Sequence, residues 1–248
     1  MTAERSDAPV RDPSRAHQYR PSVPELERPP VGDRPGESIA SPDEDPDVLL
    51  ARAGWSPLLD RILRGVCHDL NSRASSLVAV TQLVELGEPL PDAYREEAPK
   101  LHHLSDFLQR LSASTRARVE GALPRELIGE ALAMHARARE RAYEEAPPVV
   151  EDEGVPAVLV CPGRVQRGLA LLIDRCSIHW DRREDPVRLR GNEREATILI
   201  PGVEPVARGA WTDPLEAVFA MDGGRLRLGE RGAALTFPSL EAARASGR

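Results

Sequence analysis

A histidine with a carboxylate beside it is the feature of this sequence best suited to covalent chemistry. In the run Cys67-His68-Asp69-Leu70-Asn71, the imidazole of His68 is followed directly by the carboxylate of Asp69. Such a carboxylate can orient the ring and accept its proton, so that the other ring nitrogen can attack an electrophile such as phosphorus. We therefore take His68 as the candidate nucleophile, with Asp69 and Asn71 as the site residues beside it.

The residues around His68 follow a helical period. A long helical pattern runs from about residue 49 to about residue 86. Within it, mostly apolar side chains recur every three or four positions from 59 to 84, which predicts an amphipathic helix. On a helical wheel His68 lies roughly 165° from the centre of this stripe, so we expect it to face solvent. The stripe consists of Leu59, Leu63, Val66, Leu70, Ala74, Leu77, Thr81 and Val84. The outer face around the histidine is predicted to carry Arg61, Arg64, Gly65, Ser72, Ser75, Ala79 and Gln82, mostly small or polar residues that leave room for a docking partner.

A second helix is expected to lie beside the first. Breaker residues at 87–91 interrupt the helical pattern, and Asp92 is a suitable N-cap for a helix over 93–119, although Pro99 falls inside it. Two long helices joined by a short loop predict an antiparallel hairpin. Apolar stripes of this length bury more fully among four helices than between two. We therefore expect two chains to form a dimeric four-helix bundle.

Composition and pattern divide the chain into three parts. Residues 1–48 are rich in proline and charged residues, so we expect a disordered tail. Residues 49–120 hold the predicted hairpin. Residues 121–248 alternate helical and extended patterns, which predicts a small α/β domain and, for the whole chain, an α+β fold. The helices are expected at 124–142, 165–176 and 215–221, and the strands at 158–160, 197–200, 226–228 and 234–237.

The bulk properties exclude several classes of protein. A net charge of −7 argues against a general nucleic-acid role. No apolar run approaches the roughly 20 residues that span a bilayer, and the first ten residues lack the apolar core of a signal peptide, so we expect a soluble cytoplasmic protein without a membrane partner. The spacing of Cys67, Cys161 and Cys176 fits neither a zinc site nor a disulfide framework, which predicts buried thiols in a reducing compartment.

The run around His68 resembles the H-box of bacterial two-component histidine kinases. In that family the histidine lies on the first helix of a dimerising hairpin and carries the phosphoryl group, and an acidic residue commonly follows it. Many of these kinases have proline where this chain has Arg73. The resemblance covers roughly residues 55–240 and implies that His68 is the phosphate-accepting residue.

The segment 161–176 resembles the part of the kinase ATP-binding domain that carries the N-box. Its hydrophobic frame fits, and so do Pro162, Arg164 and Asp174. Leu171, however, stands where the family places a magnesium-binding asparagine, and a second asparagine of the motif falls at Arg175. Leucine cannot coordinate a hard cation, which requires oxygen ligands.

The later nucleotide-binding segments also lack motif residues of the family. The sequence 201–205 lacks the aspartate of the family's adenine-reading loop, and Gly209 alone remains of the glycine-rich phosphate loop. The segment 222–238 resembles the hairpin that closes the same domain. The second half is therefore expected to be a degenerate ATPase domain that binds neither ATP nor magnesium as a cofactor.

These resemblances imply phosphorelay signalling without ATP hydrolysis. A dimeric histidine phosphotransferase would take a phosphoryl group onto His68 from one response-regulator receiver and pass it to another. Three alternatives stay open: a divergent but active sensor histidine kinase, a non-catalytic pseudokinase scaffold, and a receiver phosphatase. In phosphatases of the family, threonine or asparagine often stands where this chain has Ser72. Whether the chain is an enzyme in its own right therefore stays open.

Overall fold

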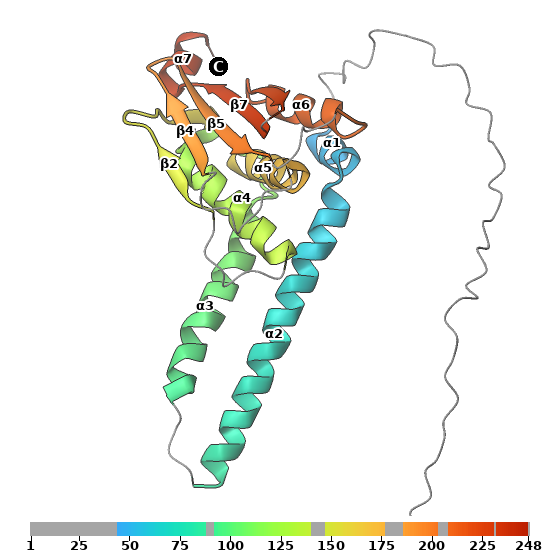
Figure 1. Ribbon diagram of the computed structural model, residues 1–248, viewed down its shortest axis with the longest axis vertical. Helices are drawn as coiled ribbons and strands as arrows, with labels where there is room; N and C mark the ends of the chain where they lie inside the picture. Colours follow the sequence, from blue (N-terminus) through green and yellow to red (C-terminus); the bar gives the residue numbers. More distant parts are fainter. Residues whose placement is uncertain are drawn as a thin grey trace, which may run out of the picture. The chain divides into compact units, whose positions relative to one another are not determined.

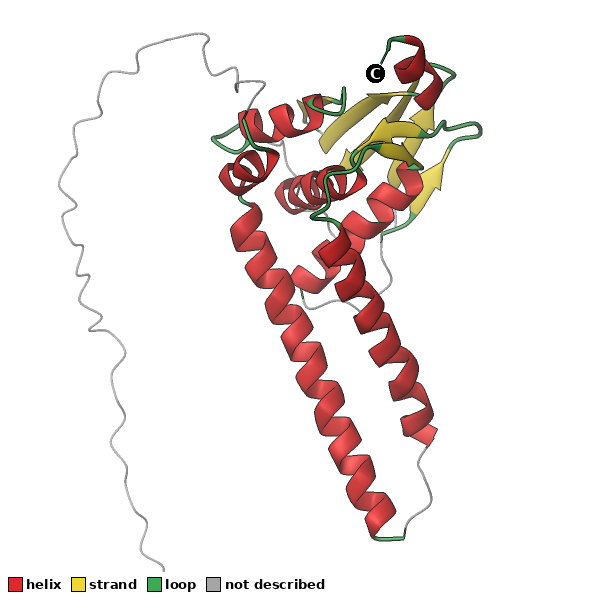
Figure 2. Ribbon diagram, turned by 180° about the vertical axis from the view of Figure 1, so that it is seen from behind, coloured by secondary structure: helices red, strands yellow, loops and turns green. Residues whose placement is uncertain are grey.

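The computed structural model describes residues 44–87, 92–139, 147–176, 186–202, 208–230 and 232–247 (Figure 1). Within them, two long helices lie side by side and lead into a sheet that carries helices on one face (Figures 1 and 2). The fold is thus a mixture of helix and sheet, as the sequence predicted. The dimeric four-helix bundle and the ATPase-like sandwich stay predictions. The predicted tail lies outside the described residues as far as residue 43.

The first predicted helix is divided in two. Helix α1 (Pro46–Ala53) begins before the predicted position 49, and the side chain of Asp45 caps it by accepting the Asp47 N–H at 2.9 Å. The helix ends at Gly54, which has a φ of 104°, and α2 (Trp55–Glu85) begins at the next residue. Glycine suits this position because side chains with a Cβ rarely adopt such a φ. One helix over 49–86 was predicted because apolar residues keep their period on both sides of the glycine.

Helix α3 (Asp92–Ala113) runs back along α2 and completes the hairpin (Figure 2). Pro99 lies inside α3 and does not end it. Both carboxylate oxygens of Glu97 accept hydrogen bonds from Arg73 Nη1 at 2.8 Å, and these bonds join the two helices. The hydrogen bond from Arg73 holds the pKa of Glu97 below its usual 4.5.

Helix α2 buries a different face from the predicted one. It packs against α4 (Pro124–Ala138) as well as against α3, and the prediction had assumed a single partner helix within the chain. Within one chain, Leu63, Leu70 and Val84 of the predicted stripe are therefore 42%, 48% and 46% exposed, and their burial in the expected dimer stays a prediction. The buried apolar side chains of α2 are Trp55, Leu58, Ile62, Val66 and Val80.

The main sheet has five strands in the order β2-β4-β5-β7-β6. Strands β2 and β4 pair in parallel, and the other neighbours are antiparallel. Helices α4, α5 and α6 lie on one face of this sheet (Figures 1 and 2). The bounds are β2 (Val149–Glu151), β4 (Val187–Gly191), β5 (Glu195–Pro201), β6 (Arg225–Gly229), β7 (Gly232–Pro238), α5 (Pro162–Cys176) and α6 (Thr212–Ala220). A separate antiparallel pair is formed by β1 (Glu120–Ala122) and β3 (Val158–Val160), and α7 (Leu240–Ala245) follows β7.

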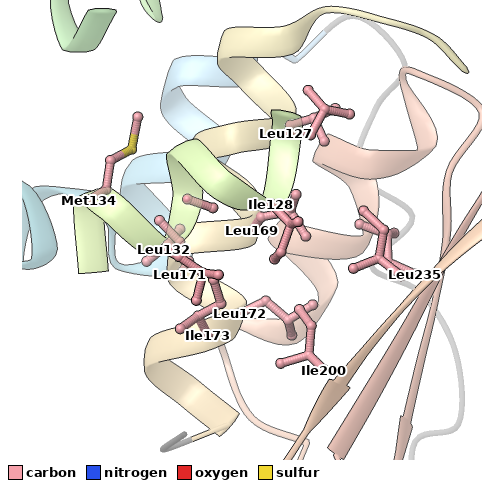
Figure 3. Close-up of a cluster of buried hydrophobic side chains, with 14 of the residues drawn as sticks. Leu127, Ile128, Leu132, Met134, Leu169, Leu171, Leu172, Ile173, Ile200 and Leu235 are labelled. Atoms are coloured by element: carbon pink, nitrogen blue, oxygen red, sulfur yellow. The ribbon is translucent and has the colours of Figure 1, made fainter. Parts of the chain in front are cut away.

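One hydrophobic core joins the sheet to the helices. Along β5, Ala196, Ile198 and Ile200 are buried while the residues between them are half-buried, so one face of the strand packs inward. Figure 3 shows Ile200 and Leu235 of the sheet in a cluster with leucines of α4 and α5. The same core includes residues of α1 and the N-terminal half of α2. The division between 49–120 and 121–248 stays a prediction.

The sequence did not predict β1, β2, β4 or α7. Strands β1 and β2 are only three residues long, too short for a period to be recognised. Strand β4 alternates valine, arginine, leucine and arginine, a strand signal that the charged residues obscured. Helix α4 ends at Ala138, before the predicted 142. No helix among the described residues is both long and apolar enough to cross a bilayer.

Candidate functional site

His68 lies on the surface of α2, in the part of the helix that packs beside α4. Its side chain is 69% exposed, as the helical wheel predicted. Arg64, Ser72 and Ser75 on the same outer face are exposed as well, and Asn71 is exposed on the next turn. The imidazole can therefore be reached by another macromolecule without rearrangement of the helix.

Asp69 is held by a residue that the sequence did not indicate. One carboxylate oxygen accepts a hydrogen bond from Nη1 of Arg137 on α4. The other oxygen is 4.0 Å from Nδ1 of His68, too far for a hydrogen bond. The guanidinium of Arg137 also lies 4.9 Å from the ring centroid of Phe107 on α3. In this arrangement Asp69 is bound to α4, and its predicted role in orienting the His68 ring stays a prediction.

A second polar cluster joins α2 to the helices of the sheet domain. Arg61 donates a hydrogen bond of 2.8 Å to Asp174 on α5, so Arg61 is not part of the free outer face predicted for α2. The fully buried His135 of α4 lies beside them, with Nε2 at 3.8 Å from an Asp174 oxygen. Burial lowers the pKa of His135 from 6.5 to about 4, so the ring is neutral at pH 7.

Gly65 is buried and does not provide docking space beside His68. A Cβ at this position would overlap the backbone carbonyl oxygen of Arg137. The absence of a side chain therefore lets α2 and α4 approach closely, which corrects the placement of Gly65 on the outer face. Ala79, the other small residue expected beside the docking space, is exposed.

The three cysteines differ in environment. Cys161 and Cys176 are buried, as expected, and burial raises the pKa of Cys176 to about 12. Cys67 is exposed on α2 immediately before His68, so the prediction of three buried thiols is wrong at this position. Cys67 is exposed because it lies away from the face of α2 that the structure buries.

The residues that resemble the N-box are used for packing. Leu171 is 1% exposed and lies in the cluster of leucines from α4 and α5 (Figure 3). The guanidinium of Arg175 lies 5.8 Å from the ring centroid of Trp211, which precedes α6. Arg164 donates two hydrogen bonds, of 2.9 and 2.7 Å, to Asp222, and so connects the start of α5 to the end of α6.

The described part of this domain offers no ready set of metal ligands. Among the described residues, no three His, Cys, Asp or Glu side chains gather closely enough to hold an ion. Residues 203–205 of the predicted adenine-reading segment lie outside the described residues. The backbone N–H of Gly209 donates to Thr212 Oγ1 at 2.9 Å. The expected loss of ATP and magnesium binding stays a prediction.

Three solved structures that resemble this chain are histidine kinases. The kinase AdeS of Acinetobacter baumannii has a TM-score of 0.36 and 14% identity, over 69% of this chain and 96% of its own. The cytoplasmic segment of QseC has a TM-score of 0.34 and 14% identity, over 57% and 93%. The kinase ThkA, in complex with the response regulator protein TrrA, has a TM-score of 0.35 and 12% identity, over 79% and 64%.

No protein-family model and no curated protein matches the chain. TM-scores this low do not assign a chain to a family. The function proposed below therefore rests on the residues of this chain.

Proposed function

We propose that the chain is a histidine phosphotransferase in two-component phosphorelay signalling. The observation that carries this proposal is His68, a nucleophile exposed on a helix whose neighbouring Ser72 and Ser75 are small. A phosphorylated receiver domain of a response regulator docks on this face. The bond from phosphorus to the receiver's aspartate oxygen breaks as a bond to a ring nitrogen of His68 forms. A second receiver then takes the phosphoryl group by the reverse exchange.

The chemistry needs little from the rest of the chain. Phosphoryl transfer depends mainly on positioning and on charge neutralisation, and in a relay of this kind the receiver normally supplies the magnesium ion. The proton on the other ring nitrogen of His68 passes to water or to Asp69. One oxygen of Asp69 lies 4.0 Å from Nδ1 of His68, and the other accepts the hydrogen bond from Arg137.

The same proposal includes a second domain without useful ATP affinity. The position that would need an oxygen ligand for magnesium is Leu171, whose side chain is part of the hydrophobic core. Arg175, where the kinases have a second asparagine, lies against Trp211. The domain then serves to support α2 through α4 and α5.

A dimer formed by the hairpins also belongs to this proposal. Leu63 and Leu70 are seven positions apart on α2 and therefore lie on one side of the helix, where both are more than two-fifths exposed. On α3, Leu108 is 37% exposed. A second copy of the chain would remove these apolar side chains from water.

Two labelling reactions test the proposal. The purified chain is mixed either with phosphorylated receivers or with labelled ATP, alongside the variant His68→Ala and the control His103→Ala, which changes an exposed histidine on α3. We expect label from a cognate receiver on the wild type and on the control, none on His68→Ala, and none from ATP. Asp69→Asn should slow the transfer without removing the acceptor.

The outcomes separate the alternatives. Label transferred from ATP to His68 would show an active kinase. Signalling that is unchanged in a strain carrying His68→Ala would favour the non-catalytic scaffold. Loss of phosphate from the receiver with no label on the chain, in the wild type and in His68→Ala alike, would favour a phosphatase.

A further inference from the structure

The face of the main sheet opposite α4, α5 and α6 carries arginines in a regular arrangement. On β4, Arg188 lies opposite Leu199 of β5, and Leu199 lies opposite Ala234 of β7. Ala234 in turn lies opposite Arg227 of β6. Because directly opposed residues in a sheet point to the same face, these four side chains form one row across it, with an arginine at each end.

A second row of the same kind runs beside the first. It consists of Arg190, Thr197, Thr236 and Arg225, again one residue from each of the strands β4, β5, β7 and β6. The hydroxyl groups of Thr197 and Thr236 are 2.9 Å apart and hydrogen-bond to each other. The floor between the arginines is therefore made of small or apolar side chains whose polar atoms are already satisfied.

The floor has short side chains and its two ends have long arginine side chains, so together they form a groove. Its volume is about 600 Å³, and its lining includes Arg188, Leu199, Ala234 and Arg227 of the first row. Neighbouring strands are about 4.8 Å apart, so three strand intervals separate the two end arginines by about 14 Å between Cα atoms. Both guanidinium groups can reach over the floor toward a single bound segment.

The first row is the more available for a ligand. In the second row, Arg225 donates to Glu195 at 2.9 Å, and Arg190 lies 3.7 Å from Asp152. Arg188 and Arg227 are exposed, and within the described ranges neither forms an ion pair with a carboxylate. Two guanidinium groups that no described carboxylate neutralises thus stand at the two ends of an apolar floor.

We propose that this groove binds an acidic, extended segment of a partner protein. Guanidinium groups match carboxylates in bidentate geometry, and Leu199 and Ala234 provide an apolar contact between the two charges. At about 3.3 Å per residue, a segment that spans the row carries acidic residues about four positions apart, with an apolar residue midway. Single-stranded nucleic acid fits less well, because its bases stack on aromatic side chains and the floor has none.

Fluorescence anisotropy with a labelled synthetic peptide tests this proposal on the full chain. The peptide has two glutamates four positions apart with leucine midway, and its partner peptide has glutamine in place of both glutamates. We expect the glutamate peptide to bind the wild type at least about tenfold more tightly than the glutamine peptide, and Arg188→Gln with Arg227→Gln to abolish this difference. Arg194→Gln with Arg225→Gln is the matched control, removing two exposed arginines that do not line the groove, and should retain most of the binding.

The proposal is independent of phosphate transfer at His68. It would be overturned if the wild type bound both peptides equally, or neither, or if the two double variants weakened binding to the same extent. Equal binding of a labelled oligothymidine at the groove, lost in Arg188→Gln with Arg227→Gln, would show a general site for polyanions and would also overturn it. Each variant alters exposed side chains, and its melting transition confirms that it is folded.

Discussion

Asp69 has two neighbours of different character, the exposed His68 and the buried guanidinium of Arg137. Its place beside His68 follows from sequence order, and so the candidate site could be proposed without a structure. Arg137 lies 68 positions away, on a helix whose sequence gives no indication of this contact. The candidate nucleophile was therefore accessible to sequence reasoning, whereas the partner of its neighbouring carboxylate was determined by how α2 packs on α4.

Removal of the Arg137 guanidinium should destabilise the fold. Both side chains of the pair are largely buried, so Arg137→Met leaves the Asp69 carboxylate without its main hydrogen-bond donor. We expect the free energy of unfolding in urea to fall by about 1–3 kcal/mol. The exposed Arg64→Met is the control and should change it by less than about 0.5 kcal/mol.

A double-mutant cycle with Asp69→Asn isolates the pair. The free energy of unfolding of the double variant should fall by less than the sum of the two single decreases. The double variant has neither the carboxylate nor the guanidinium, so no buried charge is left without its partner. Strict additivity would mean that the two residues do not interact in solution.

His135 should make stability depend on pH. Its pKa is about 4 in the folded chain and 6.5 in the unfolded chain, so the unfolded chain binds an extra proton between these values. The free energy of unfolding should therefore be highest above pH 6.5 and fall toward pH 4, by up to about 3 kcal/mol from this group. Urea unfolding of His135→Gln across this range should show a shallower dependence, whereas His103→Gln should follow the wild type.

At the scale of elements, the close approach of α2 and α4 depends on a single glycine. A methyl group at Gly65 overlaps the backbone of α4, so Gly65→Ala should lower the free energy of unfolding by about 1–3 kcal/mol. The exposed Ala79→Leu should leave stability nearly unchanged and act on receiver docking, because it fills space on the outer face of α2. Calorimetric melting of both variants measures the difference. Equal melting temperatures for Gly65→Ala and the wild type would contradict this packing.

Local pattern predicted the longer elements and missed what depends on tertiary contacts. Helices α4 and α5 and the hairpin of β6 and β7 were expected near their observed positions, because period and turn residues are local signals. Helix α3 was expected as far as residue 119 and ends at Ala113. The face that α2 buries within the chain was not predicted. Leu63 and Ile62 are equally apolar, and only the position of α4 decides which of the two is buried. The break at Gly54 was missed for a related reason, because a left-handed glycine does not interrupt the apolar period.

At the scale of the whole molecule, the exposed leucines of α2 predict the oligomeric state. If Leu63 and Leu70 lie in a dimer interface, Leu63→Glu with Leu70→Glu should give a monomer with an intact fold, because charges cannot be buried there without partners. Light scattering should report a dimer mass for the wild type and half that mass for the variant. A wild-type monomer at tens of micromolar concentration would contradict the hairpin dimer.

Helix α2 spans regions of very different burial, and this has a consequence for how its backbone exchanges hydrogen with solvent. Near its start, Leu58 and Ile62 are fully buried in the core, whereas Leu83, Val84 and Leu86 around its end are exposed. Amide protons of one unbroken helix should therefore exchange at rates that form a gradient: slowest around residue 62, where exchange requires opening of the whole core, and fastest beyond residue 80. His68 lies between these limits, where exchange rates are expected to be intermediate. A docked receiver should therefore slow amide exchange most in the helical turns just after His68.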